Sequence, residues 1–255
     1  MPAHTASARP GRKASGVAAT AVTAAAGFLL AGCSLPGDTS RSLTADATVT
    51  EAVTAVEVTD TRRGSIEVTP GAGPGVRVHR TVHYRGDRTP EPGQRVSDGV
   101  LSFTAGCADS CWVDYRLEVP ASAKVRLDSS SGRITVAGVA AAEVTSASGD
   151  VRAERIAGPL RIRTASGDIE ATDLRTPDAE IRSASGDATV GFAAPPASLS
   201  VTTASGDVRA RLPGGPYEVS ASTTSGDRDV TLASTPAAPS RLSFRTTSGD
   251  LHVSG

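Results

Sequence analysis

Apolar and polar residues alternate along most of the second half of this chain. In the stretch Leu160–Ser166, arginines separate the apolar positions, and the alternation resumes at 169–171 after Gly167 and Asp168. A period of two puts successive side chains on opposite faces, so the pattern predicts short β-strands with one buried and one wet face. The same scheme recurs at 179–183, 199–203 and 242–246. β-Branched residues and glycine dominate each unit, which disfavours helix.

A recurring Ser-Gly-Asp tripeptide interrupts the alternation. Its glycines, together with the glycine of a looser first copy (Ser-Gly-Arg), are Gly132, Gly149, Gly167, Gly186, Gly206, Gly226 and Gly249. The intervals between them are 17, 18, 19, 20, 20 and 23 residues, a regularity typical of repeat architectures. Glycine permits backbone angles that other residues avoid, and aspartate can hydrogen-bond nearby backbone. Each tripeptide is therefore predicted to form a tight corner between two strands.

Serial corners of this kind predict an all-β fold, a parallel β-solenoid of about seven short coils at 121–255. Stacking at about 4.8 Å per coil would give a rod roughly 30–35 Å long. One coil cannot bury its small apolar face alone, whereas stacked coils bury a continuous one. Hydroxyl residues stand just before four corners, at Thr164, Ser183, Thr203 and Thr246. We expect them to form a ladder, each bonded to backbone or to the hydroxyl one coil away.

The units SASGD, TASGD and TTSGD, preceded by a strand-rich segment that ends in Leu-Glu-Val-Pro, resemble the putative-adhesin family of β-strand repeat proteins. This is a domain family of unknown function, and the resemblance covers roughly residues 50–255. It implies a secreted or lipid-anchored β-solenoid with no established catalytic residues. The sixth unit departs from the pattern because Arg228 stands where an inward residue is expected. A local bulge that resets the register is the expected explanation.

Residues 1–32 have the pattern of a bacterial lipoprotein signal peptide. Three basic residues precede the uncharged stretch 14–30, which runs into Leu-Ala-Gly-Cys33, a sequence that resembles a lipobox. Cys33 is thus the expected lipidation site and would attach the mature chain to the membrane. The alternatives are an ordinary signal peptide with a chance cysteine, or a transmembrane helix. The stretch has 17 weakly apolar residues, which is short for a span.

The segments between signal and repeats differ in composition. Residues 33–48 are small and polar, which predicts a flexible tether. Residues 49–120 carry non-repetitive strand patterns divided by Gly- and Pro-rich turns, which predicts a β-rich cap over the first coil. At the other end the chain stops at Gly255, directly after the last corner. We expect a short, polar terminal strand to form an exposed edge there, the alternative being a partner that pairs with it.

The charge balance bears on partners. The full chain has 26 basic and 27 acidic residues, and without residues 1–32 the count is 23 against 27. Because no basic run tracks a phosphate backbone, no nucleic-acid partner is expected. Five arginines are candidates for a stripe down one face, which suits either solubility or weak recognition of an envelope polymer or protein: Arg161, Arg163, Arg182, Arg209 and Arg245.

The remaining cysteines, Cys107 and Cys111, lie four residues apart. In the oxidising environment outside the cell they are expected to form a structural disulfide that pins a turn. A redox pair or half of a metal site is the alternative, but the two-residue spacing of redox motifs is lacking. No metal or other cofactor is expected. The corner aspartates are interpreted as satisfying backbone amides, with a cation ladder as the alternative, and His79 and His83 are about 13 Å apart along one strand.

No catalytic residues are expected either. The turns are short, and neither a G-x-S-x-G elbow nor a serine-histidine-aspartate grouping stands out. The sequence therefore favours an extracytoplasmic, lipid-anchored and non-enzymatic surface scaffold or adhesin-like binding module. One alternative is a β-helix enzyme that acts on cell-wall or other polysaccharides. The other is an envelope-stress or signalling component that binds a membrane protein.

Overall fold

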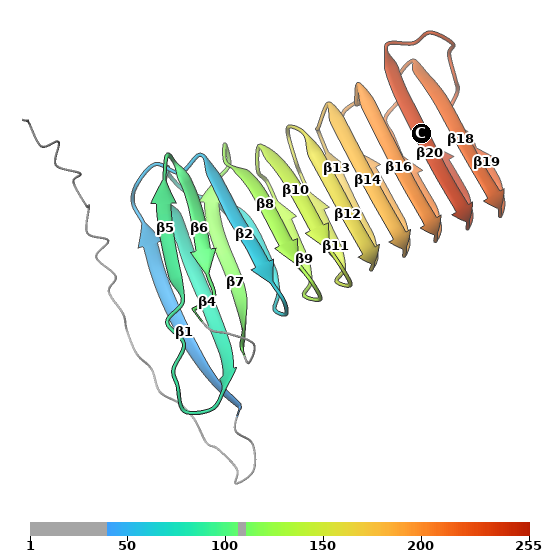
Figure 1. Cartoon of the computed structure of the whole chain (residues 1–255). Helices are drawn as coiled ribbons and strands as arrows, with labels where there is room; N and C mark the ends of the chain where they lie inside the picture. Colours follow the sequence, from blue (N-terminus) through green and yellow to red (C-terminus); the bar gives the residue numbers. More distant parts are fainter. Residues whose placement is uncertain (1–39, 107–110) are drawn as a thin grey trace, which may run out of the picture.

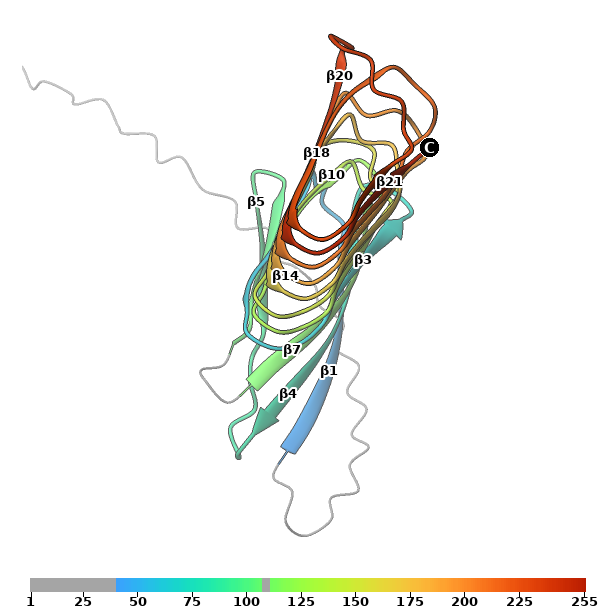
Figure 2. The same ribbon diagram turned by 90° about the vertical axis from the view of Figure 1, so that its right-hand side faces the viewer.

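The computed structural model describes residues 40–106 and 111–255. These residues form two large β-sheets that face each other across a narrow interior, joined at their edges by short turns (Figures 1 and 2). In the described ranges, no helix is both long and apolar enough to cross a bilayer. Because the elements of the described residues are β-strands in two sheets, the all-β prediction is confirmed.

Each sheet runs the length of the molecule. The first sheet has 11 strands in the order β1 (Ser40–Val49), β4 (Val76–Arg85), β7 (Cys111–Pro120), β3 (Ile66–Gly71), β9 (Ile134–Ala137), β11 (Val151–Glu154), β13 (Ile169–Leu174), β15 (Ala188–Phe192), β17 (Val208–Arg211), β21 (Leu251–Ser254) and β19 (Arg228–Val230). The second has 10 strands in the order β18 (Tyr217–Ser225), β20 (Ser240–Ser248), β16 (Ser198–Ser205), β14 (Asp178–Ser185), β12 (Leu160–Ser166), β10 (Ala141–Ser146), β8 (Lys124–Ser129), β2 (Ala55–Thr61), β6 (Val100–Thr104) and β5 (Gly93–Ser97).

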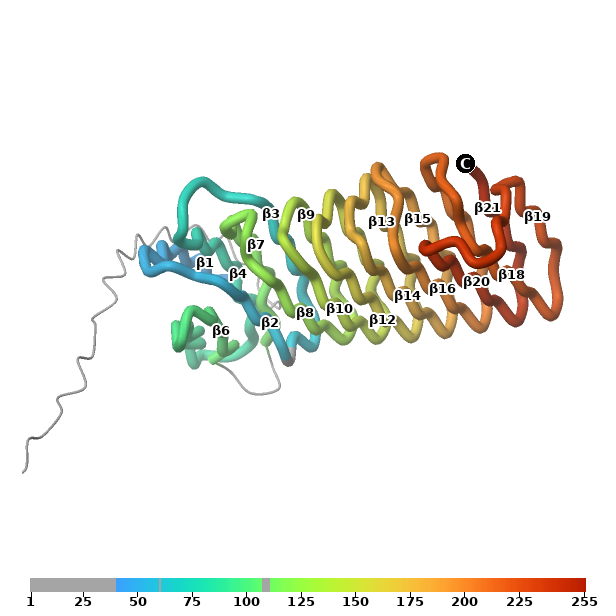
Figure 3. The backbone as a smooth tube through the Cα atoms, turned by 90° about the horizontal axis from the view of Figure 1, so that it is seen from above, coloured from blue at the N-terminus to red at the C-terminus, as the bar shows by residue number. Residues whose placement is uncertain are grey.

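The repeats form coils that stack in strict register. Each coil gives one strand to each sheet, and neighbouring coils pair in parallel, as where Ile162 of β12 lies opposite Ile181 of β14. Figure 3 shows the coils following one another along the rod. This is the predicted parallel β-solenoid, and the register brings equivalent residues of successive coils into columns.

Inward-facing apolar columns from the two sheets make the core. One column on the 10-stranded sheet includes five successive residues with no exposed surface: Val144, Ile162, Ile181, Val201 and Phe244. Opposite it, the 11-stranded sheet contributes Ile169, Ala171 and their equivalents. Full burial of a Val, Leu or Ile side chain contributes about 1.5–3 kcal/mol, so each added coil extends one continuous core.

The described residues contain one coil more than the seven expected. β2 and β3 form it, because β2 pairs in parallel with β8 and β3 with β9. The predicted cap at 49–120 therefore includes the first coil of the stack. Beyond that coil, β6 and β7 add an incomplete rung, and the antiparallel strands β4, β1 and β5 close the end.

The tether predicted at 33–48 is too long. Residues 40–48 belong to β1, which pairs antiparallel with β4 along its whole length. Most of its side chains alternate between exposed and partly buried positions, as fits a strand at the edge of the sheet. Residues 33–39 and the whole signal segment 1–32, with Cys33, lie outside the described residues, so lipidation stays a prediction.

The last two coils are inverted relative to their order in the chain. The C-terminal coil of β20 and β21 lies between the coil of β16 and β17 and the coil of β18 and β19 (Figure 3). The expected exposed edge at the C-terminal strand is therefore wrong, because β21 is paired on both sides. The expected bulge is also wrong, since Arg228 pairs with Leu251 in unbroken register. Arg228 tolerates its inward position because its coil is the outermost one.

Candidate functional site

Eight glycine corners form one column along the rod. An added Cβ at each predicted corner would meet the carbonyl oxygen of the neighbouring corner glycine, at 1.6 Å for Gly132 and 2.2 Å for Gly206. That close approach excludes any side chain. The column begins at Gly64, whose carbonyl faces Gly132. The sequence analysis missed Gly64, because it lacks the Ser-Gly-Asp motif and is separated from Gly132 by the strands of the cap.

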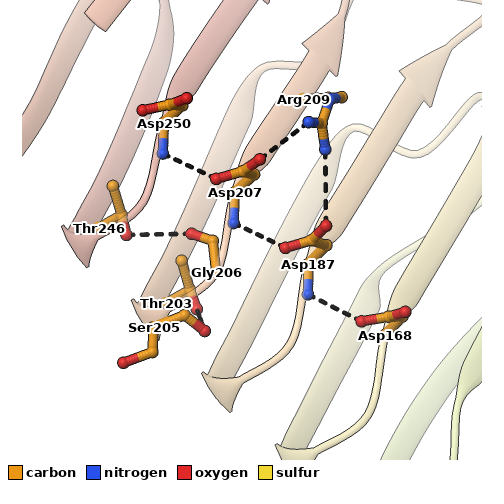
Figure 4. A network of polar contacts seen from close by, with 9 residues as sticks. All are labelled: Asp168, Asp187, Thr203, Ser205, Gly206, Asp207, Arg209, Thr246 and Asp250. Atoms are coloured by element: carbon orange, nitrogen blue, oxygen red, sulfur yellow. Dashed lines mark hydrogen bonds and ion pairs between the residues drawn. The ribbon is translucent and has the colours of Figure 1, made fainter. Parts of the chain in front are cut away.

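The corner aspartates form a directional hydrogen-bonded ladder (Figure 4). Each carboxylate except that of Asp227 accepts the backbone N–H of the aspartate in the neighbouring coil, on the side toward β18 and β19. The N···O distances are 2.8–3.2 Å. The ladder runs in the order Asp150, Asp168, Asp187, Asp207, Asp250 and Asp227. These carboxylates thus hold successive coils together. Among the described residues no group of three or more His, Cys, Asp or Glu is arranged to hold a metal ion.

Asp207 accepts hydrogen bonds from both the next coil and Arg209. The backbone N–H of Asp250 lowers the pKa of the Asp207 carboxyl, and Arg209, whose Nη2 lies 2.8 Å from Oδ2, lowers it further. Arg209 also lies 3.6 Å from Asp187 and so connects two coils (Figure 4). The role of these carboxylates is structural, because they accept hydrogen bonds from the backbone of the neighbouring coil.

The buried hydroxyl column before the corners is only partly satisfied. Thr203 and Thr246 donate to backbone carbonyls, Thr246 to that of Gly206 at 3.2 Å. The hydroxyls of Thr164 and Ser183 have no hydrogen-bond partner although both are buried. The predicted bonds to backbone are therefore confirmed for part of the column, and the predicted bonds between hydroxyls of neighbouring coils are not found for these four residues.

The cysteine and histidine predictions are resolved only in part. Cys111 is disulfide-bonded, while Cys33 and Cys107 lie outside the described residues, so the pairing of Cys107 with Cys111 stays a prediction. His79 lies 2.6 Å from Asp46, which is an exposed surface pair.

The structure reveals a serine-aspartate-histidine grouping that the sequence analysis did not find. Asp114 accepts from both the backbone N–H and the hydroxyl of Ser65 and lies 2.8 Å from His83, which stacks on Trp112. Nucleophilic catalysis requires the base next to the hydroxyl. Here the aspartate stands between serine and histidine, so the order of the groups does not suit catalysis.

The outer faces of the two sheets carry different charge patterns. On the 11-stranded sheet, outward residues of neighbouring strands form ion pairs, as in Glu67 with Arg116 at 2.9 Å and Glu170 with Arg152 at 3.1 Å, and Arg152 also lies 2.8 Å from Glu154. His252 and Asp229 make a similar pair at 2.9 Å. This face therefore neutralises itself.

The outer face of the 10-stranded sheet is hollowed by a trough of about 730 Å³. It crosses six neighbouring strands from β2 to β16, and small residues such as Ala141 and Ser200 line it beside charged ones. The charged residues in its lining are Glu57, Lys124, Arg126, Glu143, Arg161, Asp178, Glu180 and Arg182. We call this feature the axial trough, because it runs along the rod and across the strands.

Three arginines converge on one carboxylate in and beside the axial trough. Glu180 lies 2.9 Å from Arg161, 2.6 Å from Arg182 and 3.8 Å from Arg163. The predicted five-arginine stripe is thus divided. Arg161, Arg163, Arg182 and Arg245 lie on β12, β14 and β20 of the 10-stranded sheet, whereas Arg209 lies on β17 of the other.

Comparison with known proteins places this fold in a family. A family model described as Toastrack DUF4097 matches residues 95–254, which is more than half of the chain. The chain belongs to the Toastrack DUF4097 family. The expected membership of a β-repeat family of unknown function is thereby confirmed. The matched part of this Toastrack protein begins after β2 and β3, so the first coil extends the stack beyond the family model.

Solved structures resemble the Toastrack chain at low identity. A protein described as a putative adhesin from Bacteroides fragilis is 10% identical, with 84% of this chain and 97% of that chain covered and a TM-score of 0.46. A putative cell adhesion protein from Clostridium sporogenes is 8% identical, with 84% and 99% covered and a TM-score of 0.36. No curated protein matches the sequence. At such low similarity the adhesive role belongs to those descriptions alone.

Proposed function

We propose that this Toastrack protein is an extracytoplasmic, non-enzymatic surface scaffold or adhesin-like binding module, anchored to the membrane through lipidated Cys33. The observation that carries the proposal is the axial trough on a stack whose coils are held in register. An extended ligand can lie along such a trough and contact six strands at once.

The rigidity of the stack supports a binding role. Parallel strand pairing, the aspartate ladder and the glycine column each fix the position of one coil against the next. Outward side chains are therefore presented at a constant spacing of about 4.8 Å along the rod. A surface that is already ordered loses little conformational freedom on binding, which favours affinity from many weak contacts.

The trough supplies a direct test of this role. The lipidated protein is used to retain components of its own cell envelope, which are identified by mass spectrometry and on a glycan array. Ala141→Trp fills the middle of the trough, whereas Thr189→Trp puts the same side chain on the opposite outer face. We expect the first variant to lose the retained component and the second to keep it. Equal retention by both variants, or none by the parent protein, would contradict the proposal.

Lipid anchoring has a test of its own. Cys33→Ser removes the thiol that would be acylated, so the variant should incorporate no labelled fatty acid and should leave the membrane fraction. A Cys33→Ser protein that still carries the label would exclude Cys33 as the attachment site.

One observation favours the alternative of a polysaccharide-acting enzyme. Glu143 and Glu180 occupy equivalent outward positions on β10 and β14 with β12 between them, which is about 9.6 Å at the backbone. Pairs of carboxyl groups at roughly 6.5–9.5 Å act in inverting glycosidases. Release of reducing ends from a bound glycan by the parent protein, lost in Glu143→Gln, would establish this alternative in place of a non-enzymatic role.

A further inference from the structure

Two arginines on the 10-stranded sheet lie directly opposite each other. Arg163 of β12 and Arg182 of β14 are partners in the register, and both side chains point outward and are about half exposed. Like charges directly opposite on neighbouring strands destabilise a sheet. With Arg161 they share one carboxylate, that of Glu180. The cluster therefore has an excess of positive charge that the fold does not require.

Elsewhere on the rod, arginines on neighbouring strands are paired with carboxylates. On the opposite face, Glu67 meets Arg116, and Arg152 lies within ion-pair distance of both Glu154 and Glu170. On the 10-stranded sheet the column that contains Arg163 and Arg182 continues through Thr202 to Arg245 and contains no carboxylate along this stretch. The like-charged stretch therefore consists of Arg163, Arg182 and Arg245.

The arginine cluster opens onto the axial trough. Arg161, Arg182 and Glu180 are part of the trough lining, which continues along the rod to Lys124 and Arg126. Along the lining, Arg126 lies opposite Glu57 and Glu143 in the register, and Glu143 also lies opposite Arg161, so acidic and basic residues alternate there. Six strands about 4.8 Å apart give the trough a length of roughly 24 Å. Because the lining contains four acidic and four basic residues, the excess positive charge lies in the column of Arg163, Arg182 and Arg245 beside the trough.

Guanidinium groups bind carboxylate and phosphate oxygens in a planar, bidentate geometry. Arg163, Arg182 and Arg245 stand at intervals of one and two strand spacings, about 4.8 and 9.6 Å. We propose that this face binds an unbranched polymer with closely spaced oxyanion groups, either carboxylate or phosphate, laid along the column of Arg163, Arg182 and Arg245 beside the axial trough. Glu180 then acts as a positioning residue that orients the guanidinium groups. The inference rests on the proposed binding function and names its ligand class.

The test compares two double variants that lose the same charge. Arg163→Ser with Arg182→Ser removes the like-charged pair, and Arg116→Ser with Arg152→Ser removes two arginines from the opposite face. Each protein is titrated with alginate as the carboxylate polymer, with long-chain polyphosphate as the phosphate polymer and with neutral dextran. Thermal unfolding checks that both variants are folded.

We expect the parent protein to bind at least one of the two polyanions, but not dextran, with an affinity that falls as salt is raised. Loss of Arg163 and Arg182 should weaken binding about tenfold or more, while loss of Arg116 and Arg152 should change it less than about twofold. The polymer that binds tells carboxylate from phosphate. Equal weakening in both variants would assign binding to overall charge and overturn the inference, as would binding of neither polyanion.

Failure of this inference is distinguishable from failure of the proposed function. If neither polyanion binds but an envelope component is still retained and Ala141→Trp abolishes its retention, the trough is a binding site for another ligand. If nothing is retained and nothing binds, both proposals fail.

Discussion

In the buried hydroxyl column, equivalent side chains differ from coil to coil in whether they form a hydrogen bond. Thr164 and Thr246 are equivalent positions on β12 and β20, and both are at least nine-tenths buried. Only Thr246 donates to a carbonyl, that of Gly206, and the hydroxyl of Thr164 has no partner. A buried hydroxyl without a hydrogen bond is destabilising relative to a methyl group of the same size.

Thr164→Val should therefore leave the protein equally stable or stabilise it by up to about 1 kcal/mol, because no hydrogen bond is lost. Thr246→Val should destabilise it by about 1 kcal/mol, because the carbonyl of Gly206 loses its donor. Urea unfolding of the two variants beside the parent protein measures the difference. A loss of stability in Thr164→Val equal to that in Thr246→Val would contradict this reading of the column.

Asp207 and Asp227 occupy equivalent corners of the ladder but differ in the hydrogen bonds that they accept. Asp207 accepts the N–H of Asp250 and lies beside Arg209, whereas Asp227 closes the ladder and accepts no N–H from a further coil. Asp207→Ala should lower the free energy of unfolding by about 1 kcal/mol, and Asp227→Ala should change it by less than about 0.5 kcal/mol. Thermal unfolding at pH 7 checks both, and equal losses would mean that the ladder bonds do not stabilise the stack.

The stabilising effect of Asp207 should depend on pH. Its pKa is lowered in the folded state, so the ionised carboxylate stabilises the fold above the unfolded pKa of about 3.9. That contribution is lost as pH falls through the folded pKa. The stability difference between the parent protein and Asp207→Ala should accordingly be constant from pH 7 to pH 5 and shrink below about pH 4. A difference that persists unchanged at pH 2 would contradict an ionic origin.

At the scale of elements, the outermost coil protects the end of the stack. An unpaired strand edge invites pairing with other chains. On β18 the segment after β19 covers part of the edge, since Thr235 donates its N–H to the carbonyl of Tyr217 and the Ser234 hydroxyl accepts the N–H of Val219. Further along, Arg228 donates to the carbonyl of Ala221 at 3.3 Å. The chain's own groups thus occupy three of the backbone bonding positions on β18 that another strand would need.

Arg228→Leu should increase self-association through this end. The substitution exposes an apolar side chain at the open end of the core and frees the carbonyl of Ala221. Light scattering after size-exclusion chromatography should show dimers or larger species that the parent protein lacks at the same concentration, while Arg228→Lys stays like the parent. A monomeric Arg228→Leu protein would show that the loop and small polar residues protect the edge without the arginine.

At the scale of the whole molecule, both ends of the rod depart from chain order. The rung of β6 and β7 lies outside the earlier coil of β2 and β3, and the coil of β18 and β19 lies outside the later coil of β20 and β21. At the C-terminal end the outermost coil of β18 and β19 therefore precedes in the chain the coil of β20 and β21 that lies inside it. Stability in such stacks is roughly a sum of nearest-neighbour terms, so a coil paired on both sides opens less readily than an end coil.

This arrangement predicts an inverted pattern of hydrogen exchange near the C-terminus. The amides of Leu251 and Val253 on β21 should exchange more slowly than those of Arg228 and Val230 on β19, although β21 is nearer to the chain end. Exchange followed by mass spectrometry on short peptides measures this. Faster exchange in β21 would mean that the last coil lies outermost in solution.

Much of the fold follows from local chemistry that is visible in the residues. Period-two alternation determined the strands, and Gly-Asp at a near-constant interval determined the corners, because a side chain at the glycine would collide with the next coil. A chain of such units can only stack in parallel. The family resemblance rests on the same residues. By contrast, Gly64 could not be recognised, since the local motif is absent and only the tertiary pairing makes its turn a corner.

The order of the coils and the position of the proposed binding face on the 10-stranded sheet were decided by the tertiary structure alone. Leu242 and Phe244 on β20 fill an interior rung, whereas Ala221 and the inward Arg228 suit only an open end, so burial selects which of two similar coils lies inside. The alternation of each strand showed which residues point outward. It did not show that Arg163 and Arg182 would become neighbours or that Arg209 would face the other way, because cross-coil register and sheet membership bring together residues that are distant in sequence.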